Sequence, residues 1–176
     1  MKYILSTHYH DDHIDGITQL FRYGFTAGEY LHPYGDVSAN RNERMKNTLC
    51  LAQKNGVPAR RVGHGDALTF GENSMLLCAD ISNQVQEYFA AHLAPELLDA
   101  DLIKAPHHGI NRIHTDFLNA VSPEAVVITS LPDLIAEKLK AQLESRNLPY
   151  VFSGRGTVCV VTDGTDWYID QALRAF

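Results

Sequence analysis

The sequence contains little cysteine and no long apolar run. Its three cysteines are odd in number and lie far apart, which argues against a disulfide framework and favours a reducing compartment. The longest apolar runs, 75–79 and 125–128, are too short to span a bilayer. Residues 1–5 have neither the apolar region nor the cleavage site of a secretory signal. These absences predict a cytoplasmic protein without membrane association.

Positive charge is also in deficit. The formal net charge is -6 at pH 7, so the chain as a whole is not attracted to nucleic acid or to anionic lipid. The stretch 36–61 departs from this average, because only Asp36 and Glu43 oppose its basic residues. The basic residues of this stretch are Arg41, Arg44, Lys46, Lys54, Arg60 and Arg61. Two interpretations remain open for them, a solvated helix face and a local guide for a phosphorylated substrate.

The length and the alternation of apolar patterns indicate one domain, residues 1–176, of the α/β (or α+β) class. A chain of 176 residues with 45% hydrophobic residues can bury a core of its own. Strands are expected at 2–6, 27–31, 67–70, 74–79, 102–105, 125–129, 150–152, 157–162 and 166–169. Helices are expected around 14–21, before Gly24, and at 41–54, 85–98, 117–121 and 134–145.

Metal-binding side chains are concentrated where the first predicted strand ends. If His8 and His10 continue the extended chain, their rings project to the same side and can bind one cation. Asp12 and His13 follow where the chain turns into a helix, and they can address a second cation. Imidazole nitrogen together with carboxylate oxygen suits zinc, with manganese or iron as substitutes.

The segment 7–13 resembles the metal-binding loop of the metallo-β-lactamase-fold superfamily. The signature of that superfamily is His-x-His-x-Asp-His at the end of a strand, and His8, His10, Asp12 and His13 match it at every position. The resemblance implies a four-layer αββα sandwich with a site for two zinc ions at one edge of two sheets. It also implies that Asp80, which ends the apolar strand 74–79, bridges the two metals.

A second segment, 101–109, is similar to the competence-protein branch of the superfamily, which includes nuclease-type domains of DNA-uptake proteins and phosphodiesterases. The resemblance assigns His108 as a further ligand of the first metal. His107 then becomes the residue that contacts substrate phosphate or donates a proton. The roles of these two adjacent histidines can also be exchanged.

The other histidines are given structural interpretations. His64, in a turn, is not expected to bind metal, and His32 and His92 are expected at the surface. His114 follows the second motif closely enough to be a lesser candidate for a ligand or a substrate contact.

The sequence departs from the superfamily pattern at two places. The segment 130–133 lacks the late histidine that the competence-like branch carries, so Asp133 or water would have to complete a weaker second metal site. The motif also begins after only six residues, whereas superfamily members carry several strands before it. We therefore expect a domain that lacks its amino-terminal strands, with a sheet edge that favours a homodimer, or a fragment of a longer polypeptide.

The resemblance implies a metal-dependent hydrolase of the phosphodiesterase or nuclease type. A metal-bound hydroxide would attack the substrate, with Asp12 orienting it and His107 assisting the leaving group. Lactone, thioester or β-lactam hydrolysis uses the same chemistry on a small-molecule substrate and stays open. The alternative from another class is a weakened or inactive scaffold that binds a metal or a partner.

Overall fold

The structure is a computed structural model that describes residues 2–35, 38–62 and 71–173. The chain forms two compact units, Met1–Ala67 and Leu68–Phe176. Both are built from parallel strands that alternate with helices, so the predicted α/β class is confirmed. No helix within the described ranges is long and apolar enough to cross a membrane. The four-layer sandwich and the single domain stay predictions.

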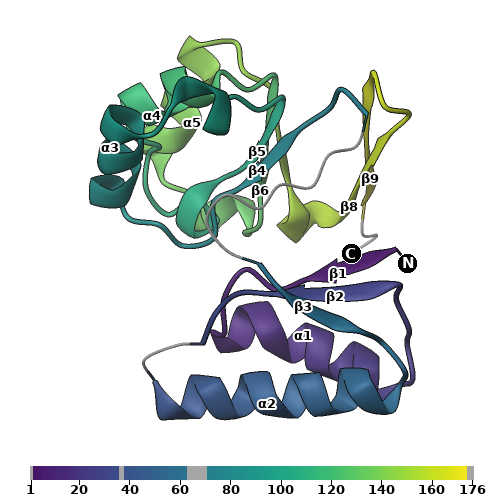
Figure 1. The fold of residues 1–176 in the computed structure, drawn as a ribbon. Coiled ribbons are helices and arrows are strands. Elements are labelled where there is room, and N and C mark those ends of the chain that lie inside the picture. Colours follow the sequence, from purple (N-terminus) through teal and green to yellow (C-terminus); the bar gives the residue numbers. More distant parts are fainter. Residues whose placement is uncertain (1, 36–37, 63–70, 174–176) are drawn as a thin grey trace. The chain divides into compact units, whose positions relative to one another are not determined.

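The first unit is a three-stranded parallel sheet with its two helices on the same face (Figure 1). The strand order is β1-β2-β3, with Ile4 paired with Tyr30 and Leu31 with Arg60. Helices connect successive strands, as parallel pairing requires. The elements in chain order are β1 (Tyr3–Leu5), α1 (Asp11–Arg22), β2 (Glu29–His32), α2 (Ala39–Lys54) and β3 (Ala59–Arg61).

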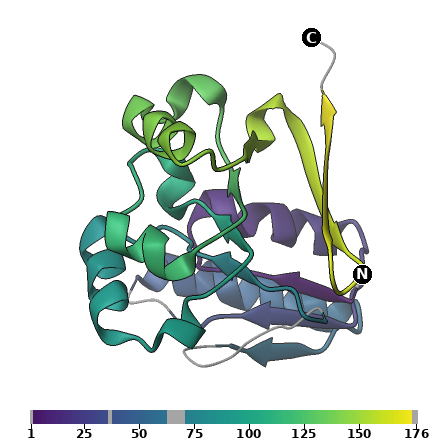
Figure 2. The same cartoon turned by 90° about the horizontal axis from the view of Figure 1, so that it is seen from above.

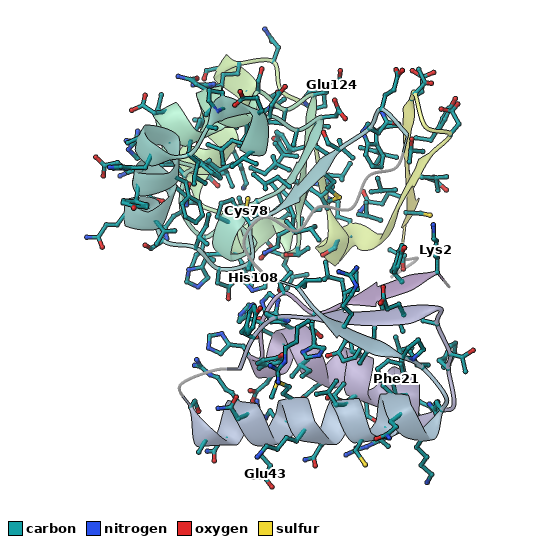
Figure 3. The ribbon with its side chains drawn as sticks, viewed as in Figure 1. Lys2, Phe21, Glu43, Cys78, His108 and Glu124 are labelled. Atoms are coloured by element: carbon teal, nitrogen blue, oxygen red, sulfur yellow. The ribbon has the colours of Figure 1, made fainter. Side chains whose placement is uncertain are left out.

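The core of the first unit lies between this sheet and the two helices. Phe21 of α1 is buried edge-on against Tyr30 of β2, with their ring centroids 5.4 Å apart. Between the helices, the buried hydroxyls of Thr18 and Thr48 lie 2.7 Å apart. Each hydroxyl also lies at hydrogen-bond distance from the carbonyl one turn earlier, so neither buried polar group is left unsatisfied. Glu43, in contrast, points away from the sheet (Figure 3).

The second unit contains a four-stranded parallel sheet in the order β4-β5-β6-β7. Its three α-helices lie on one side of this sheet, whereas a two-stranded hairpin lies on the other (Figures 1 and 2). The strands and the hairpin are β4 (Met75–Leu77), β5 (Leu102–Lys104), β6 (Ala125–Ile128), β7 (Tyr150–Phe152), β8 (Gly156–Thr162) and β9 (Trp167–Leu173). The helices are α3 (Asn83–His92), α4 (Thr115–Val121) and α5 (Glu137–Ser145), with short turns η1 (Pro95–Leu97), η2 (Pro106–Gly109), η3 (Pro132–Leu134) and η4 (Ser153–Arg155).

Apolar side chains from the sheet and the helices form the larger core of the molecule. Ile103 and Ile128 on neighbouring strands are fully buried, as is Leu139 of α5. Gly109 packs closely against two of them, because a Cβ at its position would lie 2.9 Å from Ile128 Cγ2 and 3.0 Å from Leu139 Cδ2. Its φ of 77° is also one that favours glycine. The core therefore fixes the turn that follows β5.

Most predicted elements are present, with shifted ends. The predicted helix 85–98 ends at His92, because the residues before Pro95 adopt extended backbone angles. The predicted helix 134–145 begins only at Glu137, since Leu134 belongs to η3 and Ile135 is extended. The predicted strand 67–70 lies outside the described residues.

Truncation of a core leucine tests the packing of the second unit. Leu139→Ala removes a fully buried side chain from the core, and we expect it to lower the free energy of unfolding by about 2–5 kcal/mol. The matched control is Leu134→Ala, because Leu134 is 62% exposed. Urea unfolding monitored by circular dichroism measures both. Equal stability of the two variants would contradict the assigned core.

Candidate functional site

The histidine loop, defined here as residues 7–13, connects the end of β1 to the first turn of α1. His10 is the N-cap residue of α1, but its side chain makes no capping hydrogen bond. This position normally carries serine, threonine, aspartate or asparagine, because their oxygens bind the free amides of the first turn. The His10 ring therefore does not stabilise the start of the helix in this way.

The three imidazoles of the histidine loop lie close together. His8 Nε2 is 3.1 Å from His10 Nδ1, and the rings of His8 and His13 have centroids 3.9 Å apart. The Thr7 hydroxyl lies 3.2 Å from His8 Nδ1 and 3.3 Å from His13 Nδ1. Threonine contacts on one nitrogen orient the other nitrogen of each ring, which is how outer partners orient metal-binding histidines.

Asp12 and His13 are two further candidate metal ligands at the start of α1. Asp12 Oδ2 lies 3.5 Å from His13 Nε2, and the Asp12 side chain is 60% exposed. The neighbouring Asp11 has a different role, since it forms an ion pair with Arg44 of α2. Asp12 thus faces His13, whereas Asp11 links α1 to α2.

Tyr9 anchors the loop to β2. An extended chain sends alternate side chains to opposite sides, so the residue between His8 and His10 points the other way. Tyr9 is 1% exposed, and its hydroxyl donates to the carbonyl of Pro33 at 2.6 Å. The same hydroxyl lies 3.1 Å from His32 Nδ1. The prediction that His32 is at the surface is wrong: it is 4% exposed, because it ends β2 beneath this tyrosine.

In the second unit, the predicted site residues lie at the carboxyl end of the parallel sheet. Asp80 follows β4, the pair His107-His108 follows β5, and Thr129 follows β6. Because the strands are parallel, these residues meet at one edge. Figure 3 shows His108 at this edge and Glu124, which precedes β6, at the opposite one.

The two adjacent histidines differ in their surroundings. His108 Nδ1 lies 3.2 Å from the carbonyl of Thr129, an arrangement in which Nδ1 carries the proton and Nε2 is the lone-pair donor. His108 Nε2 lies 3.5 Å from Asp80 Oδ1. His107 is exposed instead, with its ring centroid 6.3 Å from that of His108. Both residues have positive φ, a strained conformation that costs about 1–3 kcal/mol per residue and is typical of functional sites.

A buried lysine accompanies Asp80. Lys104 Nζ lies 3.9 Å from Asp80 Oδ1 and donates to the carbonyl of Ala79 at 3.1 Å. The carboxylate is thereby stabilised in a position that is largely removed from water. Burial raises the pKa of the nearby Cys78 thiol to about 12, so Cys78 remains a neutral core residue and is not a thiolate donor.

The remaining candidates fall outside these clusters. Asp133 is exposed and does not join the donors Asp80 and His108, so its suggested role as a substitute ligand finds no support. His92 is exposed, as predicted. His114 donates its backbone amide to Gln86 Oε1 at 2.9 Å. His64 lies outside the described residues.

Some of the basic side chains in the stretch 36–61 form ion pairs within the first unit. Arg44 pairs with Asp11, and Arg60 Nε lies 3.1 Å from Glu29 Oε1. Lys46 and Lys54 are exposed on α2, in keeping with a solvated helix face. The interpretation as a guide for a phosphorylated substrate stays a prediction.

Sequence reasoning missed the residues that support the donors. These residues are Thr7, Tyr9, Lys104 and Thr129, which contact the predicted histidines and Asp80. Two signals were available in the sequence. Tyr9 alternates with two histidines in an extended segment, and Lys104 interrupts an otherwise apolar strand that has to be buried on both faces.

The chain matches no protein-family model, no curated protein and no solved structure. The resemblance to the metallo-β-lactamase-fold superfamily therefore rests on the motif residues alone.

Removal of the Tyr9 hydroxyl tests the anchor of the histidine loop. Tyr9→Phe removes the hydroxyl from the Pro33 carbonyl and from the buried His32 ring, which keep only their mutual contact at 3.0 Å, and we expect a loss of about 1–3 kcal/mol in the free energy of unfolding. Tyr23→Phe is the matched control, because Tyr23 is 79% exposed. Urea unfolding compares the two. If Tyr9→Phe is as stable as the control, the anchor is disproved.

The titration of His32 tests its burial. Burial lowers the pKa of His32 from 6.5, opposed by the Pro33 carbonyl and aided by the Arg61 charge. As the pH falls, the unfolded chain therefore binds the proton first. The contribution of His32 to stability is present above pH 6.5 and is lost as the pH falls through the folded-state pKa. Proton NMR of the imidazole should give a midpoint below 6.5; a midpoint at or above 6.5 would refute this assignment.

Proposed function

We propose that this protein is a metal-dependent hydrolase of the phosphodiesterase type. The proposed metal ligands are His8, His10, Asp12 and His13 of the histidine loop, together with Asp80 and His108. Two zinc ions are the expected cofactors, with manganese or iron as substitutes and with a weaker second site. The pairing of the histidine loop with Asp80 and His108 comes from the sequence resemblance.

The observation that carries the proposal is the way in which the rings are held. Thr7 contacts Nδ1 of His8 and of His13, and Thr129 contacts Nδ1 of His108. Each ring is thus oriented through one nitrogen, which leaves Nε2 as the metal donor. Histidines that served only the core would have no need of such oriented pairs at the ends of strands.

The donor set also fits zinc. Neighbouring ligands of a tetrahedral zinc lie roughly 3–3.5 Å apart when the bonds are about 2.0–2.1 Å long. Within the second unit, His108 Nε2 and Asp80 Oδ1 are separated by 3.5 Å. Within the first, His8 Nε2 and His10 Nδ1 are separated by 3.1 Å. A combination of imidazole and carboxylate donors is the one that zinc prefers when thiolates are absent.

Different residues would carry out different parts of the proposed reaction. The cations, when bound, would supply Lewis acidity that activates water and stabilises negative charge. Asp12 is exposed enough to accept a proton from water and to orient it. His107, whose ring is exposed beside His108, is placed to contact a phosphate oxygen or to donate a proton to the leaving group. Lys104 would hold Asp80 in position.

Phosphodiesters are the preferred substrate class, because the segment 101–109 is similar to the competence-protein branch. A nucleic acid is compatible with this chemistry, although the net charge of -6 does not favour it. Small-molecule lactones, thioesters and β-lactams are the alternative substrates for the same reaction. We also propose a cytoplasmic location and a homodimer.

A second candidate function is a metal- or partner-binding scaffold with weak or no turnover. Asp133 is not a member of either group of candidate metal ligands among the described residues, and Lys104 lies beside the carboxylate that would bridge the metals. Both observations favour a second metal site of low affinity. Metal content and turnover separate the two functions.

Metal analysis and an assay of the purified full-length chain test the proposed function. We expect about one or two zinc ions per chain by mass spectrometry. We also expect hydrolysis of bis-p-nitrophenyl phosphate in the presence of zinc or manganese. His10→Ala should lose both metal and hydrolysis, since it removes a ligand. His92→Ala should keep both, because His92 is exposed on α3.

Metal binding without turnover would favour the scaffold over the enzyme. Failure to bind metal in the wild-type chain, with no hydrolysis after supplementation, would reject both the metal site and the enzyme.

A further inference from the structure

The second unit contains a pocket of about 270 Å³ that the family resemblance does not describe. It is formed by the loop after β4, by the first turn of α3 and by the segment after β5, at the carboxyl end of the sheet. In parallel α/β sheets this end is where ligands bind. The residues that line it are Ile81, Ser82, Asn83, Gln86, Pro106, His107, Asn111 and Arg112.

We propose that this pocket binds a phosphate group of the substrate. The lining contains the cation Arg112, the imidazole of His107 and several amide and hydroxyl groups, and none of the described residues in it carries a carboxylate. Among the described residues, the side chains of Asn111 and Arg112 make no hydrogen bond or ion pair. An arginine and amide donors facing a polar pocket form a combination that recognises phosphate oxygens.

Two glutamine side chains, of which Gln86 is buried, hold the pocket in shape. Gln86 is 2% exposed; its Nε2 donates to the Ile81 carbonyl at 3.3 Å, and its Oε1 accepts from the His114 amide at 2.9 Å. From the other side, Gln142 of α5 accepts from the Ile113 amide at 3.0 Å and donates to the Ile113 carbonyl at 2.8 Å. The segment that carries Arg112 is therefore fixed before any ligand arrives, which lowers the entropic cost of binding.

The two loops are also joined through the strained turn. The amide of His107 donates to the carbonyl of Ala79 at 2.9 Å, and Ala79, like His107, has positive φ. The pocket is thereby continuous along the chain with Asp80 on one loop and with His108 on the other. A phosphate held by Arg112 and His107 would fix the substrate beside these two proposed ligands. This inference rests on the proposed function. It restricts the proposed substrates to molecules that carry a phosphate next to the bond that is cleaved.

Phosphate binding to the metal-free, full-length chain tests the pocket without any turnover. Amide chemical shifts are followed by NMR during titration with inorganic phosphate and, separately, with dimethyl phosphate. We expect saturable shifts at Ser82, Asn83, Asn111 and Arg112 with at least one probe. Preference for inorganic phosphate would indicate a terminal phosphate of the substrate, whereas equal binding of dimethyl phosphate would indicate a phosphate within a chain.

Arg112→Gln should weaken this binding about tenfold, because it removes a charge-assisted hydrogen bond. Arg146→Gln, which alters an exposed arginine after α5, should bind as the wild type does. Absence of saturable shifts in the wild type, or equal affinity of Arg112→Gln and wild type, would overturn the proposal. Because no metal is present, either result leaves the metal and turnover assays to decide the hydrolase function separately.

Discussion

Parallel strand pairing is the constraint on which the site depends. In the second unit, β5 pairs with β4 on one side and with β6 on the other, so the loops after all three strands emerge at the same edge. Asp80, His108 and Thr129 come from three separate segments and meet there. The first unit follows the same rule, since the histidine loop after β1 is anchored by His32 at the end of β2. Each cluster of donors is thus a consequence of strand direction.

Buried residues hold the segments that carry the candidate metal ligands. The closely packed Gly109 holds the turn after β5, and buried Tyr9 holds the segment between His8 and His10. Positive φ at Ala79, His107 and His108 adds local strain, which the packed core tolerates. The strained backbone at the strand ends therefore lowers the free energy of unfolding. A metal that binds there would raise it again, because it would bind only the folded state.

The sequence predicted the helices and strands better than it predicted the residues that contact the candidate metal ligands. Apolar periodicity predicted α1 and α2, whereas the assignment of His8, His10, Asp12 and His13 as metal ligands stays a prediction. Helix ends were missed where a proline turn or extended residues intervened, as before α5. The burial of His32 was missed because it depends on a hydrogen bond to Tyr9 from a distant segment. Such long-range partners follow from tertiary structure, which local patterns do not specify.

We propose that the histidine loop and Asp80 bind the same metal ions. Zinc titration calorimetry of the wild type, His10→Ala, Asp80→Asn and the double variant tests it most directly. We predict that each single variant weakens zinc binding and that the double variant loses less than the sum of the two losses, since the two residues share their ions. Wild-type zinc affinity in Asp80→Asn, with affinity lost in His10→Ala, would contradict the account.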